Sequence, residues 1–203
     1  ALRLRSTRCL WDPTYKDESW IKEPVMLIPR VRGWVDRHNP GTKLAIGEYN
    51  CGGDDDPSGA VAQADVLGIF ARERVDFAYF WAGLEGVQRF AFAFYRNTDG
   101  HRKGFGESYL PTTSGAPDRV SAFAALRGDG STTVVLINED LHAPAEVALT
   151  LDGRPSPAAA ELFRLPNPPG PIRREAWKAT AGKAVVTLPP LTAAMLVVPP
   201  SRP

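Results

Sequence analysis

The sequence predicts two regions of different fold class, an α/β region followed by an all-β region. In the first hundred residues, helix-like and strand-like segments alternate with short loops between them, which is typical of a parallel sheet flanked by helices. From Asp118 onward, short apolar runs are separated by turn signals, which is typical of an antiparallel sandwich. A linker rich in Gly, Thr and Ser, residues 96–117, lies between the two.

Three helices are predicted in the first region from apolar residues at helical spacing. Residues 24–38 form the first, although Pro29 lies inside the stripe and obscures where the helix begins. Residues 58–74 form the second, with Ser58 as the expected N-cap. Residues 86–95 form the third.

The predicted strands differ between the regions in length and pattern. Residues 43–48 and 75–81 are short, mostly apolar runs, which are typical of strands buried inside a parallel sheet. In the second region, Gly128-Asp129-Gly130 predicts a hairpin turn. The six runs expected as antiparallel strands are residues 120–126, 132–138, 145–151, 158–164, 184–188 and 193–198.

The composition argues against several classes of function. The chain has 203 residues, of which 43% are hydrophobic, so it can bury a core, and its net charge of +1 favours neither nucleic acid nor an anionic membrane as a partner. No apolar run is long enough to span a bilayer. The histidines His38, His101 and His142 lack metal-ligand spacing, and phosphate loops and serine nucleophile elbows are missing. We therefore expect no metal and no other cofactor.

The stretch KLAIGEYNCGG, residues 43–53, places a glutamate at the end of a predicted buried strand. A carboxylate in that position is either paired with a cation or positioned for chemistry. Ligands of parallel sheets and barrels meet the C-terminal ends of the strands and the loops that follow. Glu48 lies at one such end and Trp81 at the next, so both are candidate site residues.

Further candidates come from the residues beside these strand ends. Tyr49 and Asn50 follow the glutamate, and the loop containing Arg8 and Trp11 precedes the first long helix, so we expect it on the same rim. Aromatic rings stack on the apolar faces of sugars, and a carboxylate can attack an anomeric carbon. The same pattern also fits a structural glutamate paired with arginine, and tryptophans that pack in the core or between a helix and a loop.

Four stretches resemble a known enzyme family more specifically. They are residues 5–21 (RSTRCLWDPTYKDESWI), 27–50 (LIPRVRGWVDRHNPGTKLAIGEYN), 58–81 (SGAVAQADVLGIFARERVDFAYFW) and 95–110 (YRNTDGHRKGFGESYL). They resemble glycoside hydrolase family 44. The resemblance implies the C-terminal portion of a (β/α)8 TIM barrel, about strands 7 and 8 with flanking helices, over residues 1–110. It implies an antiparallel β-sandwich domain over residues 111–203.

The resemblance also implies an activity and residue roles. The family hydrolyses internal β-1,4-glucosidic bonds of cellulose-type glucans and xyloglucan with retention. Glu48 matches the catalytic nucleophile at the end of strand seven, Trp81 an aromatic at the end of strand eight, and Trp11 a substrate-contacting loop, with Trp20 as the other candidate in that loop. The partner is then a β-glucan polysaccharide, and we expect the complete protein to be a secreted monomer.

Retaining glycosidases need two carboxyl groups roughly 5–5.5 Å apart, one to attack and one to protonate the leaving oxygen. The resemblance places the acid/base glutamate at the end of strand four, upstream of this chain. We therefore expect the chain to be the C-terminal part of a longer enzyme, and to be inactive and poorly soluble alone. A non-catalytic glucan-binding protein, or a retaining mannanase or xylanase on the same barrel, remain the alternatives.

Some residues depart from the family pattern. Cys51 stands where an aromatic is common, and Gly47 stands where Thr or Ser is common. Cys9 is also atypical. Two cysteines cannot define a disulfide framework, so free thiols are the simpler interpretation. A single bridge between Cys9 and Cys51 is the competing hypothesis.

Overall fold

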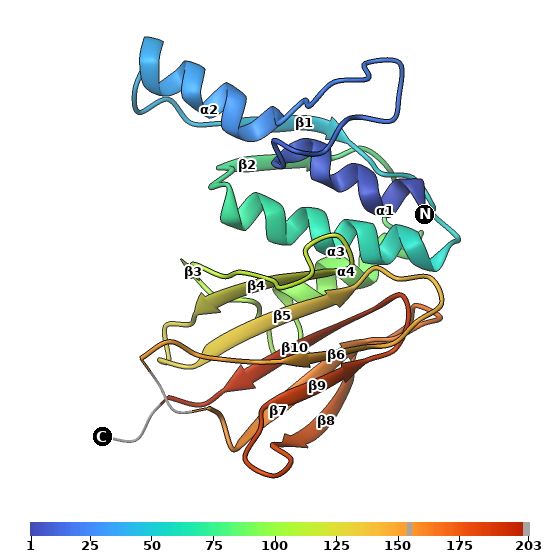
Figure 1. Ribbon diagram of the computed structural model, residues 1–203, viewed down its shortest axis with the longest axis vertical. Coiled ribbons are helices and arrows are strands. Elements are labelled where there is room, and N and C mark those ends of the chain that lie inside the picture. Colours follow the sequence, from blue (N-terminus) through green and yellow to red (C-terminus); the bar gives the residue numbers. More distant parts are fainter. Residues whose placement is uncertain (154–155, 201–203) are drawn as a thin grey trace.

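The computed structural model of the protein describes residues 1–153 and 156–200 and combines a helical layer with antiparallel sheets (Figure 1). The helices are α1 (Leu2–Ser6), the 3-10 helix η1 (Thr7–Leu10), α2 (Leu27–His38), α3 (Pro57–Arg72) and α4 (Gln88–Arg96). The strands are β1 (Ala45–Tyr49), β2 (Phe77–Phe80), β3 (Ser108–Leu110), β4 (Val120–Leu126), β5 (Thr132–Asn138), β6 (Ala145–Ala148), β7 (Ala159–Leu165), β8 (Arg173–Lys178), β9 (Val185–Leu188) and β10 (Thr192–Val198).

The strands form three sheets of different type. β1 and β2 pair in parallel and are joined through α3, as the alternation in the sequence predicts. A six-stranded sheet has the order β3-β4-β5-β10-β7-β8, and its pairs are antiparallel. β6 and β9 form a third, antiparallel pair. The prediction of mixed helix and sheet followed by antiparallel sheets is confirmed.

The helix α3 lies at the centre of the molecule. Its residues are buried almost all round, as expected for a helix covered on more than one face. It begins at Pro57, and the N-cap is Asp56, whose carboxylate accepts a hydrogen bond from the Ser58 amide at 2.9 Å. The predicted cap, Ser58, is wrong by two positions because Asp56 has the extended backbone that an N-cap requires.

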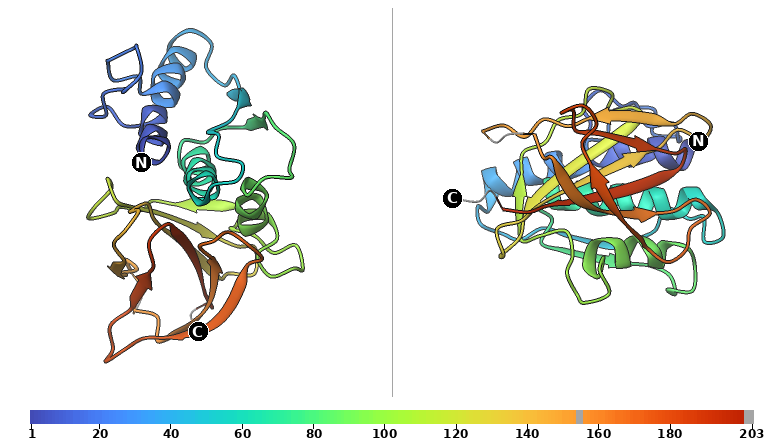
Figure 2. Two further views of the ribbon diagram at one scale, coloured as in Figure 1. Left: turned by 90° about the vertical axis from the view of Figure 1, so that its right-hand side faces the viewer. Right: turned by 90° about the horizontal axis from the view of Figure 1, so that it is seen from below.

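Two apolar cores hold the layers together. One lies between the helices α3 and α4 and the near face of the six-stranded sheet, and contains Phe94, Phe123 and Met195. The other lies between the far face of that sheet and the β6–β9 pair, and contains Leu136 and Leu196. Figure 2 shows the helical layer, in blue to green, stacked on the sheets, in yellow to red.

The contact between α3 and the six-stranded sheet depends on a glycine. A Cβ atom placed on Gly68 would lie 2.3 Å from the ring of Phe123, which is far inside van der Waals distance. Phe123 is only 1% exposed, so its ring has little room to move. Gly68 therefore sets the distance at which helix and sheet meet.

The predicted burial of the first strand is wrong. Residues 43–48 are expected as a buried strand, but β1 is half-buried only at Ile46 and Tyr49 and is otherwise exposed. β2 is likewise mostly exposed. The reason is that helices cover one face of this two-stranded sheet, and no other element in the described residues covers the opposite face.

Several short elements escape the sequence patterns. α1 and η1 occupy a segment with no recognisable period, and β3 lies in the segment assigned to the linker. β8, with the sequence RREAWK, is an edge strand whose charged residues hide its strand character. The helix α2 begins at Leu27 rather than residue 24, which leaves Pro29 in the first turn, where a missing amide is tolerated.

Candidate active site

Glu48 occupies a β-bulge at the C-terminal end of β1. Ile46 pairs with Ala78. Tyr49 pairs with Phe80, so two residues of β1 stand opposite one residue of β2. Glu48 has a φ of +53°, a left-handed conformation that glutamate rarely adopts. Such bulges and strained residues gather at functional sites because they redirect a side chain, and the Glu48 side chain is exposed.

Tyr49 turns away from solvent and packs beneath the strand. Its phenol oxygen accepts a hydrogen bond from Nε2 of Gln63 at 3.0 Å. Its ring makes edge contacts with Phe70 and Phe80, with centroids 5.0 and 5.6 Å apart. Burial raises the pKa of the Tyr49 hydroxyl. The structure therefore assigns this predicted substrate contact to packing against α3, because the bulge at Glu48 turns the Tyr49 side chain inward.

Asn50 joins the ends of the two parallel strands. Its Nδ2 donates to the Trp81 carbonyl at 2.9 Å, and its Oδ1 accepts from the Gly52 amide at 2.6 Å. The Trp81 amide in turn donates to the Tyr49 carbonyl at 3.0 Å. Both polar ends of the predicted substrate-binding amide are thus engaged by the backbone. Asn50 fixes Trp81 relative to the strand end that carries Glu48.

The loop that follows Asn50 is held by two long side chains from other elements. Arg3 donates from Nε to the Cys51 carbonyl at 2.9 Å, contacts the Ser58 hydroxyl, and lies 3.7 Å from the Asp56 carboxylate. Gln88 of α4, only 3% exposed, donates to the Gly52 carbonyl at 3.2 Å and to Asp54 Oδ1 at 2.7 Å. The rim beside Glu48 is therefore tied to both α1 and α4.

Aromatic side chains line the open face of the parallel pair. Phe77, Tyr79 and Trp81 alternate along β2 and its end, and they are 48%, 60% and 66% exposed. Ala45 of β1 stands opposite Phe77. Of these three, only Trp81 is a predicted site residue, although the alternation in VDFAYFW also indicates that Phe77 and Tyr79 share its face. Glu48 and Trp81 lie at adjacent strand ends, as predicted.

Trp11 is not on the rim with Glu48. The Arg72 guanidinium lies over its ring at 4.0 Å, and Arg72 is the last residue of α3. The rim loop leads into the first residue of α3, so Trp11 lies at the far end of that helix. The prediction is wrong because α1 and η1 run alongside α3 and carry the chain to its other end (Figure 1). Trp20, the other candidate in this loop, is 89% exposed.

Arg8, also a predicted substrate contact, is committed to a local ion pair. Its guanidinium lies 2.7 Å from the Asp12 carboxylate and 5.3 Å from the centre of the Tyr15 ring. Burial raises the pKa of Asp12, but hydrogen bonds from Thr14 and Arg8 outweigh that effect and lower it. Arg8 therefore stabilises the loop beyond η1, away from the strand ends.

Cys9 and Cys51 are free thiols. The hypothesis of a bridge between them is wrong in this structure, and the simpler interpretation holds. Burial raises the pKa of both, and Cys51, near Asp65 and Cys9, reaches about 11. A thiol with a raised pKa holds little thiolate at neutral pH, so neither is an activated nucleophile.

The acidic run that follows the rim loop is engaged in structure. Asp54 accepts from Gln88, and Asp56 caps α3. In the described part of the chain, no group of three or more His, Cys, Asp or Glu residues could hold a metal ion. Among the same residues, every helix is too short or too polar to span a bilayer.

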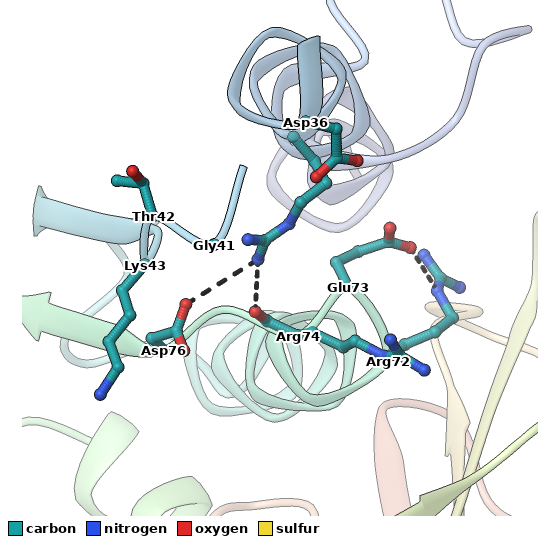
Figure 3. Close-up of a pocket in the computed structure, with 9 residues that line it drawn as sticks. Asp36, Gly41, Thr42, Lys43, Arg72, Glu73, Arg74 and Asp76 are labelled. Atoms are coloured by element: carbon teal, nitrogen blue, oxygen red, sulfur yellow. Dashed lines mark hydrogen bonds and ion pairs between the residues drawn. The ribbon is translucent and has the colours of Figure 1, made fainter. Parts of the chain in front are cut away.

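A charged cavity of about 580 Å³ lies at the opposite end of the parallel pair (Figure 3). Two of its cations, Arg32 and Arg72, are engaged within the chain. Arg32 donates to the Arg74 carbonyl at 2.6 Å and lies 3.9 Å from Asp76. Arg72 pairs with Glu73 at 2.8 Å. The cavity does not include Glu48, so it is no candidate for the chemistry of that residue.

Known proteins match almost the whole chain. No protein-family model matches it. CelM2, a bifunctional glucanase-xylanase from a metagenome library, is 40% identical and superposes with a TM-score of 0.92 over 98% of this chain and 39% of its own. Endoglucanase A of Paenibacillus lautus is 29% identical over 205 residues, which cover 96% of this chain and 29% of that protein.

A third match carries a family assignment. A Paenibacillus polymyxa xyloglucanase from glycoside hydrolase family 44, solved with xyloglucan, is 30% identical with a TM-score of 0.89 over 98% of this chain. Over almost its whole length, the chain is similar to part of this glycoside hydrolase family 44 enzyme. The chain spans 41% of that xyloglucanase, and less than half of the other two proteins. The resemblance predicted from residues 5–21, 27–50, 58–81 and 95–110 is confirmed.

Proposed function

We propose that the chain is the C-terminal part of a retaining glycoside hydrolase that cleaves internal β-1,4-glucosidic bonds of cellulose-type glucans or xyloglucan. The observation that carries this proposal is Glu48, an exposed carboxylate redirected by a bulge at the C-terminal end of a parallel strand. Trp81, exposed at the end of the neighbouring strand, offers a stacking surface for a sugar ring. The glucanase and xyloglucanase named above support the substrate class.

The proposed architecture is a (β/α)8 barrel followed by a β-sandwich, with residues 1–110 in the first domain and 111–203 in the second. β1 and β2 would be strands seven and eight. Three features support this: the parallel pairing, the connection through α3, and the open face of β2, whose exposed Phe77 and Tyr79 further barrel strands would cover. The β3–β4–β5–β10–β7–β8 sheet and the β6–β9 pair would form the sandwich.

In the proposed mechanism, the Glu48 carboxylate attacks the anomeric carbon and displaces the leaving-group oxygen, which a second carboxylic acid protonates. Water then releases the sugar from its ester with Glu48, with overall retention. The second carboxyl group belongs about 5–5.5 Å from the first. We expect it from another part of the complete protein. The β-glucan partner, the secreted location and the monomeric state of that protein stay predictions.

The decisive experiment replaces Glu48 by glutamine in the complete protein. We expect hydrolysis of β-glucan and xyloglucan to fall on the order of 10³-fold or more, because an amide cannot form the glycosyl ester. Glucan binding, measured by affinity electrophoresis, should persist. The matched control is Glu146→Gln, an exposed glutamate on β6, which should keep full activity. Undiminished hydrolysis by Glu48→Gln would contradict the proposal.

The second candidate function is non-catalytic glucan binding, which the exposed Trp20, Tyr79 and Trp81 favour. A binding protein would retain glucan without hydrolysing it, so the wild-type protein would have no activity for Glu48→Gln to remove. The third candidate function is that of a retaining mannanase or xylanase on the same barrel. Hydrolysis rates on purified glucan, xyloglucan, mannan and xylan separate these activities.

A further inference from the structure

The left-handed backbone conformation of Glu48 requires a restraint from the surrounding structure. A glutamate with a φ of +53° is strained, and such residues persist only where the surrounding structure fixes them. A Cβ atom on its neighbour Gly47 would meet nothing within 4 Å, so packing on that side does not provide the restraint. On the other side, Tyr49 is anchored. The peptide between residues 48 and 49 is planar, so anchoring Tyr49 limits where the Glu48 Cα atom, from which the carboxylate side chain projects, can lie.

The anchor of Tyr49 has an apolar part and a polar part. Phe70 and Phe80 contact the ring edge-on, at 5.0 and 5.6 Å between centroids. Gln63 lies seven residues before Phe70 on α3, which places both on the same face of the helix. Its Nε2 donates to the Tyr49 hydroxyl at 3.0 Å and fixes how far the ring reaches toward the helix.

Burying the amide of Gln63 at this position lowers the stability of the fold. It is 1% exposed, and its Oε1 has no hydrogen-bond partner among the described residues. A buried polar atom without a partner destabilises the fold, and methionine would fill the same volume without one. Stability alone therefore does not explain the amide. The hydrogen bond that the amide donates to Tyr49 explains why a glutamine stands here.

We propose that Gln63 is a positioning residue that acts through Tyr49 to hold the Glu48 carboxylate in its attacking orientation. This inference rests on the proposed role of Glu48 as the nucleophile. Gln63 lies beneath the strand and acts on the nucleophile without touching sugar. Displacements of about 1 Å at a reacting group lower rates by up to about 10²-fold, so the effect belongs in the chemical step.

The test is Gln63→Met in the complete protein, assayed with 2,4-dinitrophenyl 2-deoxy-2-fluoro-β-cellobioside. Attack by Glu48 forms an ester to the anomeric carbon as the bond to dinitrophenolate breaks, and this good leaving group needs no protonation. Inactivation thus reports the nucleophile alone. We expect the inactivation rate constant and kcat on xyloglucan to fall together, by about 10- to 100-fold, with KM changed less than twofold. The melting temperature should hold or rise.

Two further variants separate positioning from general damage. Tyr49→Phe removes the same hydrogen bond and should lower the rate by a similar factor, and the double variant should be no slower than either single variant. Asp65→Asn is the matched control, because Asp65 lies on the same helix, is 2% exposed and lies near Ser121 of the sheet. It should leave the inactivation rate unchanged.

The outcomes distinguish this inference from the proposed function. If Glu48→Gln is inactive while Gln63→Met inactivates at the wild-type rate, the positioning role is wrong and the nucleophile stands. If the two single effects multiply in the double variant, the residues act independently and the proposed linkage is also wrong. If Glu48→Gln keeps its activity, both proposals fail.

Discussion

The two parallel strands and the antiparallel sheet of this chain bury their residues very differently. β5 is buried at every position, because it has β4 and β10 as neighbours and a packed layer on each face. β1 has only β2 as a neighbour and helices on one face, and most of its residues are exposed. The strand sequences are similarly apolar. Burial therefore follows from the number of covered faces and edges rather than from strand composition.

The largest expected effect comes from removing a ring on the covered side. Phe123→Ala should lower the free energy of unfolding by about 3–5 kcal/mol, because Phe123 is 1% exposed and leaves a cavity against α3. Phe77→Ala in the same 203-residue chain should lower it by less than about 1 kcal/mol, because Phe77 is 48% exposed. Urea unfolding measures both. Equal losses would contradict the comparison.

The variants Phe123→Ala and Phe77→Ala also test the proposed barrel. In the complete protein, barrel strands would cover the open face of β2, so the loss from Phe77→Ala should approach that from Phe123→Ala. A loss that stays below about 1 kcal/mol in the complete protein would argue that the face remains uncovered.

The next largest expected effect on the free energy of unfolding comes from replacing a glycine inside a helix by alanine. Gly68→Ala in the 203-residue chain should lower the free energy of unfolding by about 1–3 kcal/mol, because its Cβ would lie 2.3 Å from Phe123. Gly33→Ala in α2 is the control, since a Cβ there meets nothing within 4 Å. It should raise stability by up to about 1 kcal/mol, as alanine favours helix. Thermal unfolding of both variants measures the difference, and a stabilising Gly68→Ala would contradict the tight contact.

The smallest expected effect is a pH dependence at the contact between α3 and the sheet. Burial raises the pKa of Asp65 on α3, and burial together with the Asp65 charge raises that of Glu139. Glu139 accepts a hydrogen bond from Ser121 at 3.0 Å. Because both folded-state pKa values lie above the unfolded ones, the favourable contribution is complete below about pH 4 and is lost as pH rises through the folded values.

Asp65→Asn removes one of these carboxyl groups. The unfolding free energy of the wild type should fall relative to that of the variant between pH 5 and pH 8, measured by urea unfolding. Asp56→Asn is the control of opposite sign. Hydrogen bonds from Ser58 lower the pKa of Asp56, so its contribution is present above about pH 4 and is lost as pH falls. A wild type that gains stability over Asp65→Asn as pH rises would contradict the assignment.

The candidate site was only partly predictable from sequence. Glu48 and Trp81 could be placed because strand ends follow from local apolar runs, and the ends of adjacent parallel strands meet at one edge. Trp11 and Arg8 could not, because their position depends on the path of α1 and η1 along α3. Tyr49 and Asn50 had the right location, but whether each side chain faces sugar or protein depends on the bulge, which no local pattern announces.

The sequence by itself determined the order and type of the long elements, the hairpin at residues 128–130 and the two strand ends that carry Glu48 and Trp81. These depend on periodicity and turn residues within a few positions of one another. The tertiary structure decided the left-handed backbone of Glu48, the buried amide of Gln63 beneath it, and the exposure of β1. Each of these depends on contacts between segments distant in the chain, and such contacts leave no periodic trace in the sequence.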